Sequence, residues 1–183
     1  MKTNPLDQLS GICEQLLFRV ANLHKSFKQF FIETMFCYFL ITGRVNFSQM
    51  ARFSQSCESR FRQNFKKKFD WVAFNTGLAD KTEGHSRFQI EFIYRDAKQF
   101  TGLNDCQARN ANSLDFAFNA SLSAVNIAKA LSAESGLNLS VEDVKILIHN
   151  TVMAQRILST FGKDSGKTLQ GDLPLTRKQK FFE

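Results

Sequence analysis

The chain has 183 residues, of which 43% are hydrophobic and 22% are charged, and these values are ordinary for a protein that buries a core. Its formal net charge of +7 favours a polyanionic partner, either nucleic acid or an anionic membrane surface. The excess charge is local, because residues 1–76 contain 11 Lys and Arg residues against 5 acids, whereas residues 77–183 contain 13 against 12.

The most apolar stretch runs from Phe30 to Ile41 and includes Glu33. It is too short to span a bilayer, which takes roughly 20 residues, so we expect a buried helix and no membrane partner. The N-terminus lacks the charged start and apolar run of a signal peptide. Four cysteines without paired spacing indicate reduced structural thiols in a cytoplasmic protein.

Apolar spacing predicts two helices at the beginning of the chain. Asn4 and Pro5 have the pattern of an N-cap followed by proline in the first turn, and apolar residues then recur at helical spacing as far as Leu23. Ser26 is the expected cap of a second helix, which ends at Gly43. Two short helices are expected next, over residues 47–53 and 57–69.

A polar stretch with two glycines, from Asn75 to Ser86, is the expected domain boundary, which we place after residue 76. Residues 87–100 show both strand-like alternation and a helical face, and their length favours a helix. Further helices are expected over 113–133 and 140–161, the second opened by Ser140. Residues 163–183 are polar and basic, as expected of a flexible tail. The predicted fold class is all-α.

Residues 46–68 have the pattern of a helix-turn-helix. Asn46 or Ser48 can cap the first short helix, and residues 54–56 are the expected turn. In the second helix, residues four positions apart place one apolar stripe toward the core. The members of this stripe are Cys57, Phe61 and Phe65.

The opposite face of the second helix carries residue types that suit duplex DNA. Arg binds guanine with two hydrogen bonds, Gln and Asn bind adenine in the same way, and Lys contacts phosphates without reading sequence. The alternative is a solvated basic face on an ordinary helix pair, and the usual turn glycine is absent. The expected DNA-binding residues are Arg52, Arg60, Arg62, Gln63, Asn64, Lys66, Lys67 and Lys68.

A second candidate site lies on the helix predicted over residues 87–100. Arg87, Glu91 and Lys98 stand at positions i, i+4 and i+11, which places them within about 40° of one another. A carboxylate between two cations can hold a divalent metal while the cations contact a DNA backbone. The alternative is a surface ladder of ion pairs from Arg87 through Glu91 to Arg95, which has little consequence.

The order Arg87, Glu91, Lys98 resembles the Tyr–Arg–Glu–Lys signature of the DDE-type insertion-sequence transposases. The segment over residues 87–109, RFQIEFIYRDAKQFTGLNDCQAR, is similar to the C-terminal block of that family. Residues 114–129 resemble the helix that follows this block, and residues 43–75 resemble the family's N-terminal DNA-binding region. Together the similarity covers most of residues 1–160.

The resemblance implies roles for the three residues of the signature. Glu91 would be the third acidic residue of a triad that binds Mg²⁺ or Mn²⁺, and Arg87 and Lys98 would contact DNA near the scissile phosphate. In the family, the two other acids are aspartates on strands of an RNase H-like sheet. The signature tyrosine is absent here, because Gly84 stands at its position.

The upstream aspartates are also missing, since only 15 residues separate Asn75 from Glu91. That length has no room for a sheet of several strands. We therefore expect an internally deleted transposase in which residues 77–162 are a helical remnant of the catalytic domain, left without its sheet. Cleavage should be lost, and no cofactor is expected in this chain.

Three functional hypotheses follow. In the first, the protein is a transposase-related, cytoplasmic and nucleoid-associated protein that binds double-stranded DNA at the terminal repeats of an element without cutting it. It would act alone or in oligomers with itself or with an intact transposase. In the second, it is a transcription regulator that uses the same helix-turn-helix. In the third, it is an active nuclease whose missing carboxylates come from another chain.

Overall fold

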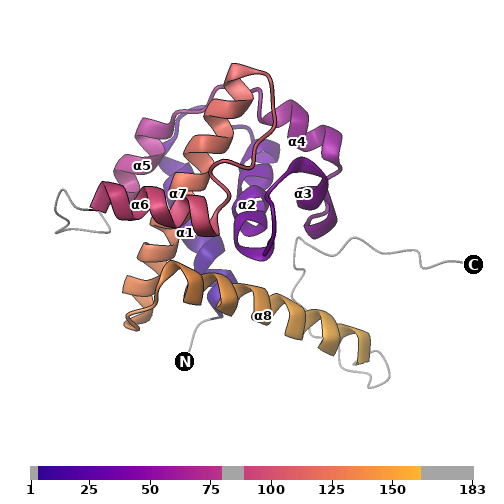
Figure 1. Ribbon diagram of the computed structural model, residues 1–183, viewed down its shortest axis with the longest axis vertical. Coiled ribbons are helices and arrows are strands. Elements are labelled where there is room, and N and C mark those ends of the chain that lie inside the picture. Colours follow the sequence, from indigo (N-terminus) through magenta and orange to yellow (C-terminus); the bar gives the residue numbers. More distant parts are fainter. Residues whose placement is uncertain (1–3, 80–88, 162–183) are drawn as a thin grey trace, which may run out of the picture.

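The computed structural model describes residues 4–79 and 89–161, and within these ranges it contains eight α-helices and no strand (Figure 1). The expected all-α fold is confirmed for this part of the chain. None of the helices described is long and apolar enough to cross a membrane. The helices are α1 (Pro5–Arg19), α2 (Lys25–Leu40), α3 (Phe47–Phe53), α4 (Glu58–Asn64), α5 (Trp71–Ala79), α6 (Gln89–Phe100), α7 (Ala111–Ser135) and α8 (Val141–Phe161).

The first helix, α1, begins where the sequence predicts. The Oδ1 of Asn4 accepts a hydrogen bond from the backbone N–H of Leu6 at 3.1 Å, which confirms Asn4 as the N-cap. Pro5 occupies the first turn, where its missing N–H costs nothing. The apolar face of α1 is buried and the helix contacts α2, α5, α7 and α8.

Both limits of α2 differ from those expected. Its N-cap is His24, whose Nδ1 accepts a hydrogen bond from the backbone N–H of Ser26 at 3.3 Å. Ser26 therefore lies in the first turn, because the imidazole already binds the N–H group that a cap must satisfy. The helix ends at Leu40, before Gly43, because Ile41 has an extended backbone (φ −80°, ψ 114°) and buries its side chain.

The apolar helix α2 lies at the centre of the bundle (Figure 1), and the buried helix predicted for the stretch from Phe30 to Ile41 is confirmed as far as Leu40. It contacts α1, α3, α7 and α8. A helix that is apolar around most of its circumference is stable in water only where other elements surround it. Its buried residues are Phe27, Phe30, Phe31, Glu33, Thr34, Met35, Phe36, Cys37, Tyr38, Phe39 and Leu40.

The aromatic part of the core is built around Phe116 of α7. The centroid of its ring lies 4.6 Å from that of Phe65 and 5.1 Å from that of Trp71. Tilted and edge-on contacts of this kind add to the stabilisation that burial of the rings supplies. Further rings lie 6.2–6.4 Å from Phe116 and complete the cluster: Phe27, Phe30, Phe31 and Phe69.

The domain boundary expected after residue 76 falls inside α5. Phe74 and Leu78 of α5 are buried, and the helix contacts α1 and α7. Buried residues from Leu6 to Val152 form one continuous cluster. Within the described ranges, the segments on either side of residue 76 therefore share one core, because α5 turns Phe74 and Leu78 inward.

The last three helices agree with the predicted ones to within a few residues. Ser140 opens α8, since its Oγ accepts from the N–H of Asp143 at 3.1 Å and the Oδ2 of Asp143 accepts from the N–H of Ser140 at 3.0 Å. Lys145 of α8 donates from Nζ to the carbonyl of Phe100 at the end of α6. Burial of Lys145 lowers the pKa of its ammonium group to about 8. The predicted tail over residues 163–183 lies outside the described ranges.

Replacing Phe116 with alanine should lower the free energy of unfolding by about 3–5 kcal/mol, because a buried ring is lost and a cavity remains among its neighbours. Urea unfolding followed by circular dichroism measures the change. Phe118→Ala is the matched control, since Phe118 lies on the same helix and is 37% exposed. Equal losses in the two variants would contradict a core organised around Phe116.

Candidate nucleic-acid interface

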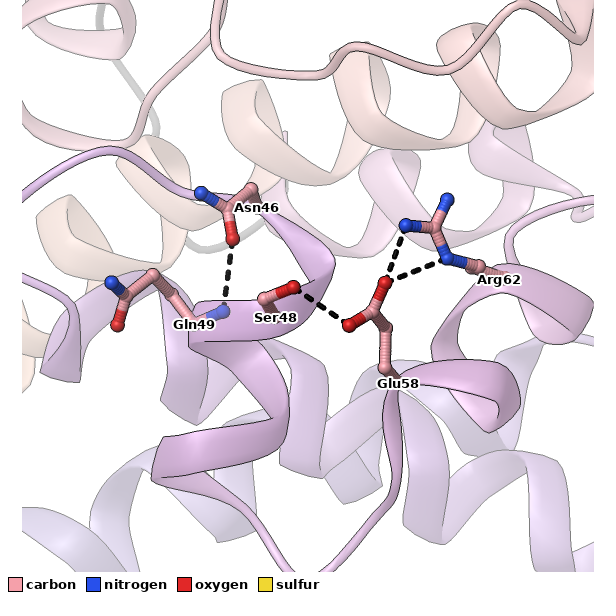
Figure 2. A network of polar contacts seen from close by, with 5 residues as sticks. All are labelled: Asn46, Ser48, Gln49, Glu58 and Arg62. Carbon is pink, nitrogen blue, oxygen red and sulfur yellow. Dashed lines mark hydrogen bonds and ion pairs between the residues drawn. The ribbon is translucent and has the colours of Figure 1, made fainter.

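The two short helices predicted over residues 46–68 are present as α3 and α4. Asn46 caps α3, because its Oδ1 accepts from the backbone N–H of Gln49 at 2.9 Å (Figure 2). Ser48, the other candidate cap, donates from Oγ to the Oε2 of Glu58 at 2.6 Å instead. Ser48 therefore links α3 to the first turn of α4.

A buried carboxylate holds the turn between α3 and α4. Glu33 of α2 is 5% exposed, and its Oε1 accepts from the N–H groups of Gln55 at 2.6 Å and Ser56 at 3.0 Å. Its Oε2 accepts from the hydroxyl of Ser56 at 2.5 Å. These three donors offset the cost of removing a carboxylate from water. The turn expected at residues 54–56 is thus attached to the central helix of the bundle.

The second helix is shorter than the predicted range of 57–69, because α4 ends at Asn64. The N–H groups of residues 66 and 67 bond to carbonyls three residues earlier, so the backbone tightens and leaves the helix. It turns there because Phe69 enters the aromatic core, where its ring centroid lies 4.9 Å from that of Phe31. Three exposed lysines follow the helix instead of lying on it: Lys66, Lys67 and Lys68.

The predicted apolar stripe of α4 is confirmed at two of its three positions. Phe61 and Phe65 are buried, at 0% and 1% exposure. Cys57 is exposed, because it is the N-cap residue and lies on the turn before the helix begins. A hydrogen bond between its Sγ and the Oγ of Ser59, at 3.0 Å, is the largest cause of a lowered pKa for the Cys57 thiol.

Arg62 is held on the outer side of α4 by neighbours from both short helices. Its Nε donates to the Oε1 of Glu58 at 2.8 Å, and its guanidinium carbon lies 5.2 Å from the ring centroid of Phe47. Figure 2 shows Ser48 and Arg62 converging on the same carboxylate. These bonds lower the pKa of Glu58, the hydroxyl of Ser48 contributing most and Arg62 next. Glu58 is therefore ionised at neutral pH.

Two residues expected to face DNA turn toward the protein. Asn64 is 9% exposed, and its Nδ2 donates to the carbonyl of Arg60 at 2.9 Å, so the expectation that it stands on the exposed face is wrong. Its short side chain bonds to its own helix one turn back. Arg60 is half-buried, and its Nη2 donates to the carbonyl of Ser26 at 3.4 Å.

The other expected residues are exposed on or directly after the two short helices. Arg52 lies in the last turn of α3, and Gln63 lies in α4. The Nζ of Lys67 lies 5.5 Å from the ring centroid of Phe27, so this lysine covers an aromatic edge of the core. We call the following set the α3–α4 basic surface: Arg52, Arg60, Arg62, Gln63, Lys66, Lys67 and Lys68.

The second candidate site is only partly described. Glu91 and Lys98 are exposed on α6, which confirms that this segment is helical, and Arg87 lies outside the described ranges. Arg95 pairs with Asp96 at 3.2 Å. Within residues 4–79 and 89–161, no three His, Cys, Asp or Glu side chains are grouped so that they could hold a metal ion.

Two acids that shape this region were not among the expected site residues. Glu33 positions the turn, and Asp105 accepts from the N–H of Val45 at 2.7 Å and so holds the chain that enters α3. An acid isolated in an apolar run indicates a buried partner, which was the available signal for Glu33. Asp105 has no comparable local signal, since its partner is 60 positions away.

Comparison of the chain with protein-family models, with curated proteins and with solved structures gave no match.

Glu33→Ala should lower the free energy of unfolding by about 2–4 kcal/mol, because it leaves buried donors of the turn without an acceptor. Hydrogen exchange should also become faster in α3 and α4 than in α7. Urea unfolding and hydrogen-exchange mass spectrometry measure the two effects. Glu14→Ala, at an exposed acid of α1, is the control. A Glu33→Ala protein as stable as this control would contradict the role assigned to the carboxylate.

Ser48→Ala should raise the pKa of the Glu58 carboxyl group toward its ordinary value of 4.5, because the strongest hydrogen bond to the ionised form is removed. The pKa is depressed in the folded state, so this bond stabilises the fold above the ordinary pKa, and the contribution disappears as pH falls through the folded value. Carbon-13 NMR titration of Glu58 measures the shift. Ser59→Ala serves as control, and an unchanged Glu58 pKa in Ser48→Ala would refute the contact.

Proposed function

We propose that this protein binds double-stranded DNA through the α3–α4 basic surface and does not cleave it. The observation that carries the proposal is a charge imbalance between Arg44 and Lys68. Seven basic residues lie in this segment beside one acid, Glu58, which Arg62 and Ser48 already bind. A net positive surface of this size attracts the phosphate backbone and releases condensed counterions when it binds.

In this proposal, the residues of the α3–α4 basic surface have two different roles, base recognition and phosphate binding. Arg60 and Gln63 lie on α4, and their side chains are of the types that bind guanine and adenine edges in the major groove. The hydrogen bond from Arg60 to the carbonyl of Ser26 is long, at 3.4 Å, so breaking it costs little free energy. The three lysines after α4 are placed for phosphate contacts, which orient the protein without reading sequence.

We further propose that the DNA is the terminal repeat of a mobile element and that the chain is related to DDE-type transposases. The support is the similarity of residues 43–75 and 87–109 to the two ends of that family. Glu91 contributes one carboxylate, and two-metal phosphoryl chemistry needs more acidic ligands than that. Nicking of supercoiled plasmid by purified protein with Mg²⁺ or Mn²⁺, abolished by Glu91→Ala, would overturn the non-catalytic proposal in favour of a nuclease completed by another chain.

A transcription regulator is the second candidate function. It is favoured by one observation, which is that α3 and α4 pack on the same continuous core as α7 and α8, so the pair is supported without a catalytic sheet. Preference for an operator near a promoter over terminal repeats, measured by competition in a DNA-binding assay, would select the regulator over the transposase relative.

Wild-type protein should bind a labelled duplex with an affinity that falls steeply as salt rises. The Lys66/Lys67/Lys68 triple alanine variant should reduce the slope of log affinity against log salt by about 2–3, since each lost phosphate contact removes about 0.9. Fluorescence anisotropy across a salt series measures both slopes.

The control removes the same number of charges elsewhere, in an Arg109/Lys129/Arg156 triple alanine variant. Equal slopes for the two triple variants would show that binding follows net charge and not the α3–α4 basic surface. A folded wild-type protein that binds no duplex at low salt would refute the proposed function.

A further inference from the structure

A cavity of about 370 Å³ lies against the basic surface, between α3 and residues 102–108. Its volume is in the range of small-molecule sites in proteins. The walls come from α2, α3, α4, residues 102–108 and α7, so the cavity exists only in the folded chain.

The two sides of the cavity are held at a fixed separation. Asp105 Oδ2 accepts from the N–H of Val45 at 2.7 Å, which joins the segment before α7 to the segment before α3. Gly102 has φ +66°, and a Cβ at this position would come 2.9 Å from the Cβ of Val45. The close approach therefore needs glycine. A cavity whose walls are joined in this way is formed before any ligand arrives.

The cavity has two arginines and no acid among the residues that line it. Arg62 is oriented by Glu58 and by the ring of Phe47. Arg52 makes no ion pair that the structure describes within residues 4–79 and 89–161, and its side chain is exposed. Arg52 is therefore the cation with an open position for an anion, and a guanidinium binds a carboxylate with two parallel hydrogen bonds.

The inner wall is aromatic. Tyr38 and Phe65 are buried at 2% and 1% exposure, and the ring of Phe47 meets that of Phe65 edge-on, with 4.9 Å between centroids. The hydroxyl of Tyr38 donates to the carbonyl of Ala117 at 3.2 Å, which anchors this side chain to α7. Amide side chains of Gln49 and Gln107 supply further donors and acceptors to the cavity. This combination suits a planar ligand with a polar substituent.

We infer that this cavity binds a small planar carboxylate of about one ring, whose carboxylate pairs with Arg52 while its ring contacts the aromatic wall formed by Phe47 and Phe65. The second part of the inference rests on the proposed function. Arg52 and Arg62 belong both to the cavity and to the α3–α4 basic surface, so a bound carboxylate neutralises charge that DNA would otherwise meet. Ligand and DNA therefore weaken each other's binding to the same extent.

Alkylation of Cys106 can report ligand binding, because this cysteine lines the cavity and is partly exposed. Cys57 is the other accessible thiol, and Cys57→Ser removes it while keeping a good N-cap residue. Cys13 and Cys37 are buried, and burial raises the pKa of both thiols, so they react slowly. In the Cys57→Ser chain, alkylation by iodoacetamide thus reports mainly on Cys106, and peptide mass spectrometry identifies the labelled residue.

The probe is 4-hydroxybenzoate, and it should slow alkylation of Cys106 about tenfold or more at saturation, since a ligand in the cavity covers the thiol. The uncharged 4-hydroxybenzyl alcohol and the ringless acetate should leave the rate unchanged. Arg52→Ala and Arg52→Gln should both lose the protection, whereas Arg109→Ala, at an exposed arginine outside the cavity, should keep it. An unprotected Cys106, or equal protection by the benzyl alcohol, would overturn the assignment of a carboxylate site.

A second measurement separates the site from the proposed function. The 4-hydroxybenzoate probe should weaken duplex binding by wild-type protein, and the benzyl alcohol should not. Protection of Cys106 together with unchanged DNA affinity would overturn the coupling and leave the ligand site in place. Protection in a protein that binds no DNA at all would refute the proposed function alone, because alkylation is measured without DNA.

Discussion

The structure depends on a buried carboxylate at the centre of a helical bundle. Glu33 lies in the buried, mostly apolar part of α2, where an unpaired charge would cost several kilocalories per mole. Three donors from the turn between α3 and α4 occupy its oxygens, so the carboxylate is tolerated only while that turn is in place. The core and the basic surface are therefore coupled. Loosening of the turn leaves a charge unsatisfied inside the bundle, and repacking of α2 removes the support of α3 and α4.

The aromatic cluster around Phe116 also connects the basic surface to the core, because it holds the segment that follows α4. Phe65 and Phe69 follow α4, Trp71 begins α5, and all three pack on a ring from α7. Because Phe69 is drawn into this cluster, α4 ends early and the three lysines leave the helix axis. The position of the lysines is thus a consequence of core packing. Apolar contacts inside the bundle determine where the proposed DNA-binding residues lie on its surface.

The proposed ligand site and the proposed DNA surface use the same two arginines for different reasons. Arg62 is partly neutralised by Glu58 and stacks on Phe47. It therefore helps to form the wall of the cavity and adds little net positive charge. Arg52 has no such partner described and contributes charge. In this proposal, the carboxylate in the cavity and the DNA on the surface both bind Arg52. Binding of either one therefore lowers the affinity for the other, and the ligand can regulate DNA binding.

Several features of this protein are predictable from the sequence alone. They are the helical class, the positions of most helices, the Asn4 and Ser140 caps, the burial of the stretch from Phe30 to Ile41, and the concentration of positive charge before residue 69. These features follow from local rules of periodicity, capping and composition, which act within a few residues of the chain. Which polar side chains remain exposed depends instead on how the helices pack against one another. The side chain of Asn64 is buried against its own helix. Helix α4 ends at Asn64 because Phe69 packs in the core, and α5 spans the expected domain boundary. The cavity beside α3 depends on Asp105 reaching Val45 across 60 positions. Contacts between distant residues leave no periodic trace in the chain, and they are formed only when the helices pack.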